Sequence, residues 1–244
     1  QDMARELALE ALESDGRRRV SLARKALALD PDCAHAYRAL AEHAPELETT
    51  IQHFRAAAAA AARTLGPEIF EEEVGSFWGI SATRPYMEAV KGLADTFFWS
   101  GRYQEAAEHY TELLRLNPND NQGVRDILAP ALMILNDNTA AQRLLDEYAD
   151  DVTAAPAFNA ALVAFRRRGD TKVARKRLAK ALRRNSHIPP LLLQRRELPD
   201  ELPFGYTLGS VEEAAYYLAC ARRAWAGSPG ALEWLAAVVD EDRP

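Results

Sequence analysis

The sequence has few of the residues that build disulfide bonds, metal sites or membrane segments. Of 244 residues only two are cysteines, Cys33 and Cys220, and their separation excludes the short spacings of metal or redox motifs. Two unpaired thiols are typical of a reducing compartment, so we expect a cytoplasmic protein in which both cysteines act as small buried side chains. The longest apolar run, residues 56–62, is far shorter than the roughly 20 residues that cross a bilayer, so we expect no membrane contact.

Sequence motifs for catalysis are also missing. There is no glycine-rich phosphate loop, no HExxH or GxSxG motif and no cluster of cysteine and histidine ligands. The five histidines are scattered, and spacing identifies no partnered base beside any of them. The oxygen-rich run NPNDNQG, residues 117–123, lacks the spaced acids of a calcium loop and indicates a turn and a helix cap. The sequence therefore predicts a protein that is not an enzyme and that uses no metal or cofactor.

What the sequence does contain is a helical repeat, clearest between Met87 and Asp120. Counted from Met87, the residues at positions 7, 8, 11, 15, 17, 20, 24 and 32 are Leu, Ala, Phe, Gly, Tyr, Ala, Tyr and Pro. The small residues let two antiparallel helices approach, the aromatic side chains fill gaps, and Gly101 and Pro118 end the two helices. This stretch resembles the tetratricopeptide repeat, whose period is about 34 residues, and the resemblance implies a helical hairpin.

The same pattern recurs with decreasing fidelity on both sides of this repeat. Turns at residues 15–16, 136–137 and 169–170 separate segments whose apolar residues are spaced three and four apart. No segment alternates as a strand does, so we expect five helical hairpins. Because each hairpin exposes an apolar face that it cannot bury alone, neighbouring hairpins stack. The sequence predicts an all-α fold, a tetratricopeptide-like α-solenoid wound as a right-handed superhelix, in a single domain spanning residues 1–244.

Two segments interrupt the regular array. Residues 66–84 form an aromatic, glycine-containing insertion, and residues 188–244 begin with a stretch rich in proline and leucine. Ser210 and Glu213 then have the spacing of a capping box, which predicts the start of a helix. The terminal helices of a solenoid must close its core against water, so we expect residues 188–244 to be a C-terminal cap rather than a separate domain.

The C-terminal region carries a second resemblance. Between Asn185 and Leu235, the runs NSHIPPLLL, SVEEAAYYLACARRAW and GALEWL are similar to the C-terminal region of the suppressor of tumorigenicity 7 protein family. That family offers no catalytic motif to transfer, so this resemblance implies a scaffold and no reaction.

The tetratricopeptide resemblance also implies where a partner binds. In such arrays, positions 2, 5, 9, 12 and 13 of each first helix line a concave groove. We expect the groove to hold a peptide or protein with apolar anchors and at least one acidic group, since Trp, Met and Arg contribute strongly at interfaces. Alternatively, Phe98, Trp99 and Met133 pack against the neighbouring hairpin. The predicted groove residues are Arg38, Glu88, Lys91, Asp95, Phe98, Trp99, Gln122, Arg125, Met133, Asn159, Arg166 and Arg167.

Charge is unevenly distributed along the chain. The net charge is −6, yet residues 166–196 contain twelve Lys and Arg and one acid, a net charge of +11 that leaves −17 elsewhere. Such asymmetry can steer an acidic ligand, or it can pair with an acidic surface of the same chain or of a second copy. A nucleic acid could bind this basic stretch through its phosphates, but no aromatic residue is available there to stack on bases. A solvated helix face or a contact with another protein is therefore the favoured interpretation.

Together these patterns predict a non-catalytic scaffold that binds a peptide or protein partner in its groove. The alternative is a regulatory sensor module of a longer protein, which binds a small molecule or a nucleic acid through residues 166–196. The chain begins at Gln1 rather than at methionine, so these residues do not exclude an upstream domain or a leader.

Overall fold

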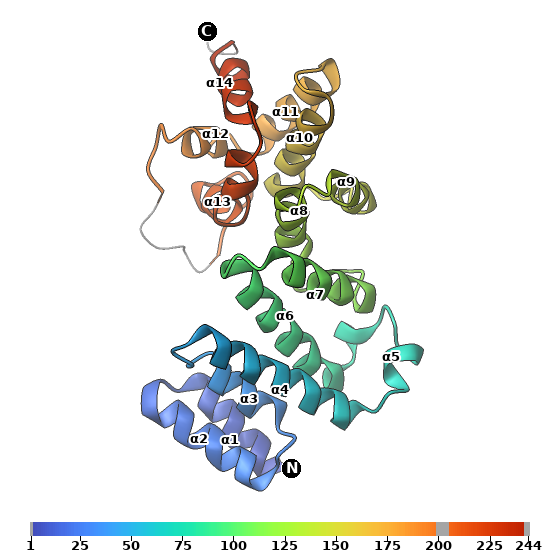
Figure 1. The fold of residues 1–244 in the computed structure, drawn as a ribbon, viewed down its shortest axis with the longest axis vertical. Coiled ribbons are helices and arrows are strands. Elements are labelled where there is room, and N and C mark those ends of the chain that lie inside the picture. Colours follow the sequence, from blue (N-terminus) through green and yellow to red (C-terminus); the bar gives the residue numbers. More distant parts are fainter. Residues whose placement is uncertain (1, 199–204, 242–244) are drawn as a thin grey trace. The chain divides into compact units, whose positions relative to one another are not determined.

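Helices account for the regular structure of the chain. The computed structural model describes residues 2–198 and 205–241, and within these ranges it contains α-helices, two short 3-10 helices and no β-strand (Figure 1). The chain divides into two compact units, residues 1–124 and 125–244, each with a hydrophobic core of its own. The predicted fold class, an all-α, tetratricopeptide-like α-solenoid, is confirmed. That the whole chain forms a single domain stays a prediction.

The first unit contains three of the five predicted hairpins. Helix α1 (Asp2–Glu13) pairs with α2 (Gly16–Leu29), α3 (Ala34–Ala41) with α4 (Leu47–Leu65), and α6 (Arg84–Trp99) with α7 (Tyr103–Leu116). Buried positions of α1, α2 and α3 are mostly alanine, and they recur at the spacing of one helix face. Small side chains bring helix axes close together, which explains how short helices pack tightly here. These alanines are Ala4, Ala8, Ala11, Ala23, Ala26, Ala36 and Ala39.

The α6/α7 hairpin follows the repeat pattern closely. Gly101 has a φ of +84°, which glycine adopts without strain, and Arg102 donates its N–H to the carbonyl of Phe97 at 2.8 Å to close helix α6. Buried Tyr110 donates its hydroxyl to the Asp95 carboxylate at 2.6 Å, which links the two helices. Helix α7 ends at Leu116, just before the predicted stop at Pro118. The sequence therefore predicted the ends of this hairpin correctly.

The residues between α4 and α6 fold against the α6/α7 hairpin. They contain α5 (Ile69–Glu72) and the 3-10 helices η1 (Phe77–Gly79) and η2 (Ser81–Thr83). Phe77 is fully buried against the rings of Phe70 and Tyr86, with ring centroids 5.3 and 6.3 Å away. Gly75 donates its N–H to the carbonyl of Leu116 at 3.1 Å. Aromatic packing and this backbone hydrogen bond hold the segment in place.

The described part of the second unit contains the other two hairpins and three further helices. Helix α8 (Arg125–Ile134) pairs with α9 (Asn138–Glu147), and α10 (Ala154–Arg168) pairs with α11 (Lys172–Arg184). Helices α12 (Ile188–Leu192), α13 (Val211–Ala226) and α14 (Ala231–Glu241) follow, and α13 packs against α8, α10 and α12. The α8/α9 turn uses Asn136 at a φ of +64° where the α6/α7 and α10/α11 turns use Gly101 and Gly169, and Asp137 caps α9 by accepting the Ala140 N–H. None of the described helices is long and apolar enough to cross a lipid bilayer.

Buried hydrogen bonds tie the C-terminal helices to α10. The buried carboxylate of Glu213 accepts the Ala154 N–H at 2.9 Å, the Asn185 side-chain amide at 3.0 Å and the Gly209 N–H at 2.7 Å. Ser210 caps α13 as predicted, because its hydroxyl accepts the Glu213 N–H at 3.1 Å. The carboxylate itself reaches Gly209 and α10 rather than the N–H of Ser210, so only half of the capping box forms.

Candidate partner-binding surface

In the first unit, helices α3 and α6 bring several predicted groove residues together. Arg38 of α3 donates to Glu88 of α6 at 2.5 Å and to Glu42, one turn along its own helix, at 2.8 Å. On α6, Lys91 pairs with Asp95 at 2.7 Å. All these side chains are roughly a third exposed or less, so the pairs form a half-buried row of charges along the surface.

An open pocket lies at the C-terminal ends of α3 and α6. It has a volume of about 690 Å³, and its apolar walls come from Leu47 and Phe54 of α4 and from Trp99 of α6, with Glu42 and Asp95 among its polar residues. Trp99 is 58% exposed and Leu47 is 45% exposed, although both are large apolar side chains. The Trp99 ring packs edge-on against buried Phe98 at a centroid distance of 5.0 Å. We call this feature the Trp99 pocket.

A second pocket, of about 630 Å³, lies at the N-terminal ends of α3 and α6. Charged residues of both signs line it, among them Arg5, Arg84 and Glu88, together with His35. Burial lowers the pKa of His35, and the nearby Glu88 carboxylate only partly opposes this. His35 is therefore neutral near pH 7 and contributes no positive charge to the pocket.

Three predicted groove residues are buried instead. Phe98 is 4%, Met133 0% and Asn159 1% exposed, so the prediction that they line a groove is wrong. Phe98 packs against Trp99 and Tyr103 inside the α6/α7 hairpin, and Met133 belongs to the core of the second unit. The alternative interpretation, packing against the neighbouring hairpin, agrees with Met133, which shares a core with α10, whereas the ring contacts of Phe98 lie within its own hairpin. It is not correct for Trp99, whose ring is largely exposed.

Asn159 and Gln122 depart from the repeat register for different reasons. Asn159 is turned inward, where its side-chain oxygen accepts the Tyr217 hydroxyl at 3.1 Å. The repeat pattern places Gln122 in a first helix, but α8 begins only at Arg125, so Gln122 lies in the preceding loop. Its side-chain amide donates to the carbonyl of Met87 at 3.3 Å. The register of an ideal repeat therefore misplaces Gln122 because α8 begins late, and it misplaces Asn159 because that side chain pairs with Tyr217 of α13.

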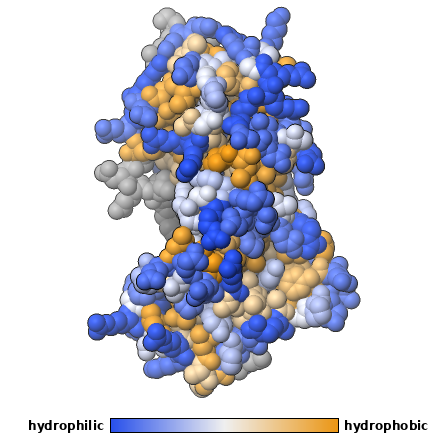
Figure 2. Space-filling model, viewed as in Figure 1, coloured by the Kyte–Doolittle hydropathy of each residue, from blue (hydrophilic) through white to orange (hydrophobic). Residues whose placement is uncertain are grey.

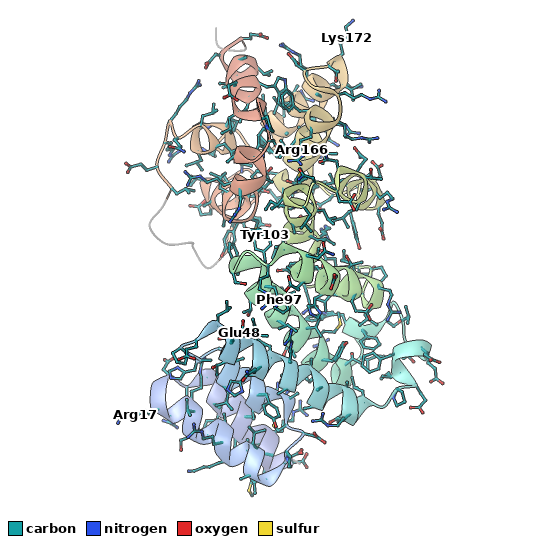
Figure 3. The ribbon with its side chains drawn as sticks, viewed as in Figure 1. Arg17, Glu48, Phe97, Tyr103, Arg166 and Lys172 are labelled. Carbon is teal, nitrogen blue, oxygen red and sulfur yellow. The ribbon has the colours of Figure 1, made fainter. Side chains whose placement is uncertain are left out.

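The predicted arginines of the second unit differ in their surroundings. Arg125 pairs with Asp151 at 2.6 Å and lies over the Tyr148 ring at 5.0 Å. Arg166 is held inside the unit (Figure 3) by Asn136 at 2.8 Å, Asn138 at 2.6 Å and Ser228 at 2.6 Å. Burial lowers the pKa of Arg166. Arg166 thus stabilises two turns, whereas Arg167 is exposed at the end of α10.

The structure adds wall residues that the sequence prediction missed. Leu47, Thr50 and Phe54 line the Trp99 pocket from α4, which is a second helix, whereas the groove rule considers only first helices. The available signal was Leu47 itself, a large apolar residue at the exposed start of a helix.

Two observations concern a thiol and metal binding. Burial raises the pKa of the Cys33 thiol, which keeps it protonated and unreactive. Among residues 2–198 and 205–241, no group of three or more His, Cys, Asp or Glu side chains is placed to hold a metal ion.

Residues 88–120 match the family model of the tetratricopeptide repeat. The matched segment is most of the α6/α7 hairpin, and it includes the face of α6 that carries Lys91, Asp95 and Trp99. Repeats of this class generally act in protein–protein interaction, through the surfaces that stacked hairpins present. No curated protein matches the chain. The resemblance of residues 185–235 to the suppressor of tumorigenicity 7 family has no support in these comparisons and stays a prediction.

Proposed function

We propose that this chain is a non-catalytic scaffold that binds a peptide or protein partner on the surface formed by α3, α4 and α6. The observation that carries this proposal is the Trp99 pocket, an open apolar hollow next to an exposed tryptophan in the hairpin that matches the repeat. Tryptophan is strongly enriched among the residues that dominate binding energy at interfaces. An exposed tryptophan beside a pocket is therefore what we expect of a surface that a partner covers.

The charges around the pocket indicate which kind of partner residue enters it. Arg38 and Lys91 are already paired with carboxylates, and the pocket itself contains Glu42 and Asp95 but no lysine or arginine. We therefore propose a large apolar side chain as the anchor that fills the pocket. The acidic group predicted for the partner has less support at this surface, because it would meet carboxylates first.

The alternative, a sensor module acting through residues 166–196, has weaker support. Arg166, Arg177 and Arg184 are held by amide, hydroxyl or carbonyl oxygens, and Arg175 and Arg195 pair with acids of the same unit. The stretch is therefore partly used to hold the second unit together. A cytoplasmic location likewise remains a proposal.

Peptide display with the full chain as bait tests the scaffold proposal. Selected peptides are expected to share a large apolar residue, and Trp99→Ala should weaken their binding about 30-fold, as loss of an interface hot spot does. The matched control is Leu29→Ala, which removes another exposed large apolar side chain from the same unit. If the peptides bind both variants as well as the original chain, the pocket is not the binding site.

A further inference from the structure

The exposed side of α11 carries a line of four cations. Lys172, Lys176, Lys180 and Arg183 follow one another at i, i+4, i+8 and i+11, and all four are exposed. At about 100° per residue, this spacing places them on one narrow stripe of the helix. Figure 3 shows Lys172 projecting away from the ribbon, and Figure 2 shows hydrophilic side chains at this end of the α10/α11 hairpin. We call these residues the basic stripe.

The acidic residues of the second unit leave the basic stripe unpaired. Arg175, on the flank of the stripe, takes both Asp170 at 2.8 Å and Glu241 at 2.6 Å. Arg177 and Arg184, on the other flank, donate to backbone carbonyls of Ala160 and Val152. Within the described part of the chain, no ion pair involves any of the four stripe residues.

Helix α1 carries a stripe of the opposite charge with the same spacing. Asp2, Glu6, Glu10 and Glu13 also follow one another at i, i+4, i+8 and i+11, and all four are exposed. Only Glu10 has an ion pair among the described residues, an exposed contact with Arg18 at 2.6 Å. Such exposed pairs are weak and exchange easily with other partners. We call these residues the acidic stripe.

We propose that the acidic stripe of one copy of this chain binds the basic stripe of a second copy. Both stripes span about 16 Å and carry four charges at matching intervals, so opposite charges face each other in parallel register. In antiparallel register, the positions of opposite charges along the helix axes still differ by at most about 1.5 Å. The complementary surface needed to cover each stripe is thus present on the chain itself.

A second copy fits these observations better than a nucleic acid does. The chain has a net charge of −6, which opposes a polyanion, and none of the exposed residues of α11 is aromatic. Because exposed ion pairs are weak and screened by salt, the association is concentration-dependent and is lost at high ionic strength. Two different surfaces are joined, so copies either pair reciprocally as a dimer or continue as an open chain.

Charge reversal with sedimentation velocity tests this proposal. The full chain is expected to associate at about 30 mM salt and to be monomeric at about 500 mM salt. Lys176→Glu with Lys180→Glu leaves two cations and two carboxylates in the basic stripe, and Glu6→Lys with Glu10→Lys leaves two carboxylates and two cations in the acidic stripe. Each altered stripe has no net charge and places like charges opposite the unchanged stripe, so each double variant alone should be monomeric. An equimolar mixture of the two variants should associate again, as should one chain carrying all four changes.

The matched control is Arg143→Glu with Arg222→Glu, which changes the net charge as much as the α11 double variant does. Both arginines are exposed in the second unit, outside α11, so this control should associate like the original chain. Circular dichroism checks that each variant is folded.

Three results would overturn the proposal. The first is a monomeric mass for the original chain at every concentration in low salt. The second is failure of the mixed variants to recover association. The third is a monomeric chain whose basic stripe binds a fluorescent duplex DNA or RNA, with anisotropy that Lys176→Glu and Lys180→Glu abolish.

Discussion

The first two hairpins and the C-terminal helices bury their contacts in different ways. In α1 to α3 the buried residues are mainly alanines, and helices approach closely because nothing large separates them. In α10 to α14 the core contains Phe158, Trp225 and Trp234, and buried polar groups accompany these rings. Small residues are thus enough to bring the helices of a regular repeat close together. The irregular terminal helices instead use specific polar partners that define their position.

The polar partners in the second unit join residues far apart in sequence. Glu213 accepts from Ala154 of α10, and Tyr217 donates to Asn159 while accepting from Trp225 at 2.7 Å. An average hydrogen bond contributes about 1 kcal/mol to the free energy of unfolding, whereas a buried polar group left without its partner lowers that free energy by about 1–3 kcal/mol. Stability in this unit should therefore depend on single polar residues, in contrast to the first two hairpins.

The largest expected effect tests this dependence. Replacing Glu213 with alanine removes the acceptor of three donors, of which the Ala154 N–H and the Asn185 amide are buried. The free energy of unfolding should therefore fall by about 3 kcal/mol, measured by urea denaturation. Glu147→Ala, which removes an exposed glutamate of the same unit, is the control and should have little effect. An equally small effect for Glu213→Ala would mean that packing alone places α13.

A smaller effect is expected where the first unit depends on a close approach. A Cβ atom on Gly92 would lie 2.2 Å from a ring carbon of Phe54, so any larger residue at this position must displace that ring. Gly92→Ala should lower the free energy of unfolding by about 2 kcal/mol, as overpacking does. Adding Phe54→Leu should recover part of the loss, which a double-mutant cycle measures.

The control for this prediction is Gly79→Ala, because a Cβ atom there meets no atom within 4 Å. If Gly92→Ala and Gly79→Ala lower the free energy of unfolding equally, α4 and α6 can move apart at no cost. Close packing would then matter less to the stability of the first unit than we propose.

The smallest expected effect is a difference in the pH at which each unit loses stability. In the first unit, burial lowers the pKa of His35 and His109, so the folded state favours their neutral forms. The stability that these neutral histidines contribute is present above their unfolded pKa of about 6.5. It is lost as the pH falls through their lowered pKa values in the folded state. In the second unit, burial alone would raise the pKa of Asp151, but hydrogen bonds from Thr153 and Arg125 lower it overall.

The stabilising effect of Asp151 is therefore present above its unfolded pKa of about 3.9 and is lost only at lower pH. Hydrogen exchange followed separately in the two units should show the first unit weakening as the pH falls below about 6.5, before the second unit does. His109→Gln should reduce this early loss, while His43→Gln, at an exposed histidine, should not. Simultaneous weakening of both units would contradict the assignment.

Local patterns predicted a large part of the fold. The five hairpins, the Gly101 turn, the Asn136 turn and the Ser210 cap all follow from spacing and turn residues, because these features depend on a few neighbouring residues. The site was predicted less well. Arg38, Glu88, Lys91, Asp95 and Trp99 lie on one surface of the first unit, as the repeat pattern implies, but the Leu47 and Phe54 wall was missed.

By itself, the sequence determined that the chain is helical, where its hairpins turn and which faces carry charge, since each of these depends on periodicity along one helix. Only the tertiary structure decided that Trp99 is exposed while Phe98, Met133 and Asn159 are buried, and that Glu213 binds α10. Both outcomes depend on which helix packs against which face. That choice is made by contacts between residues distant in sequence, which periodicity does not encode.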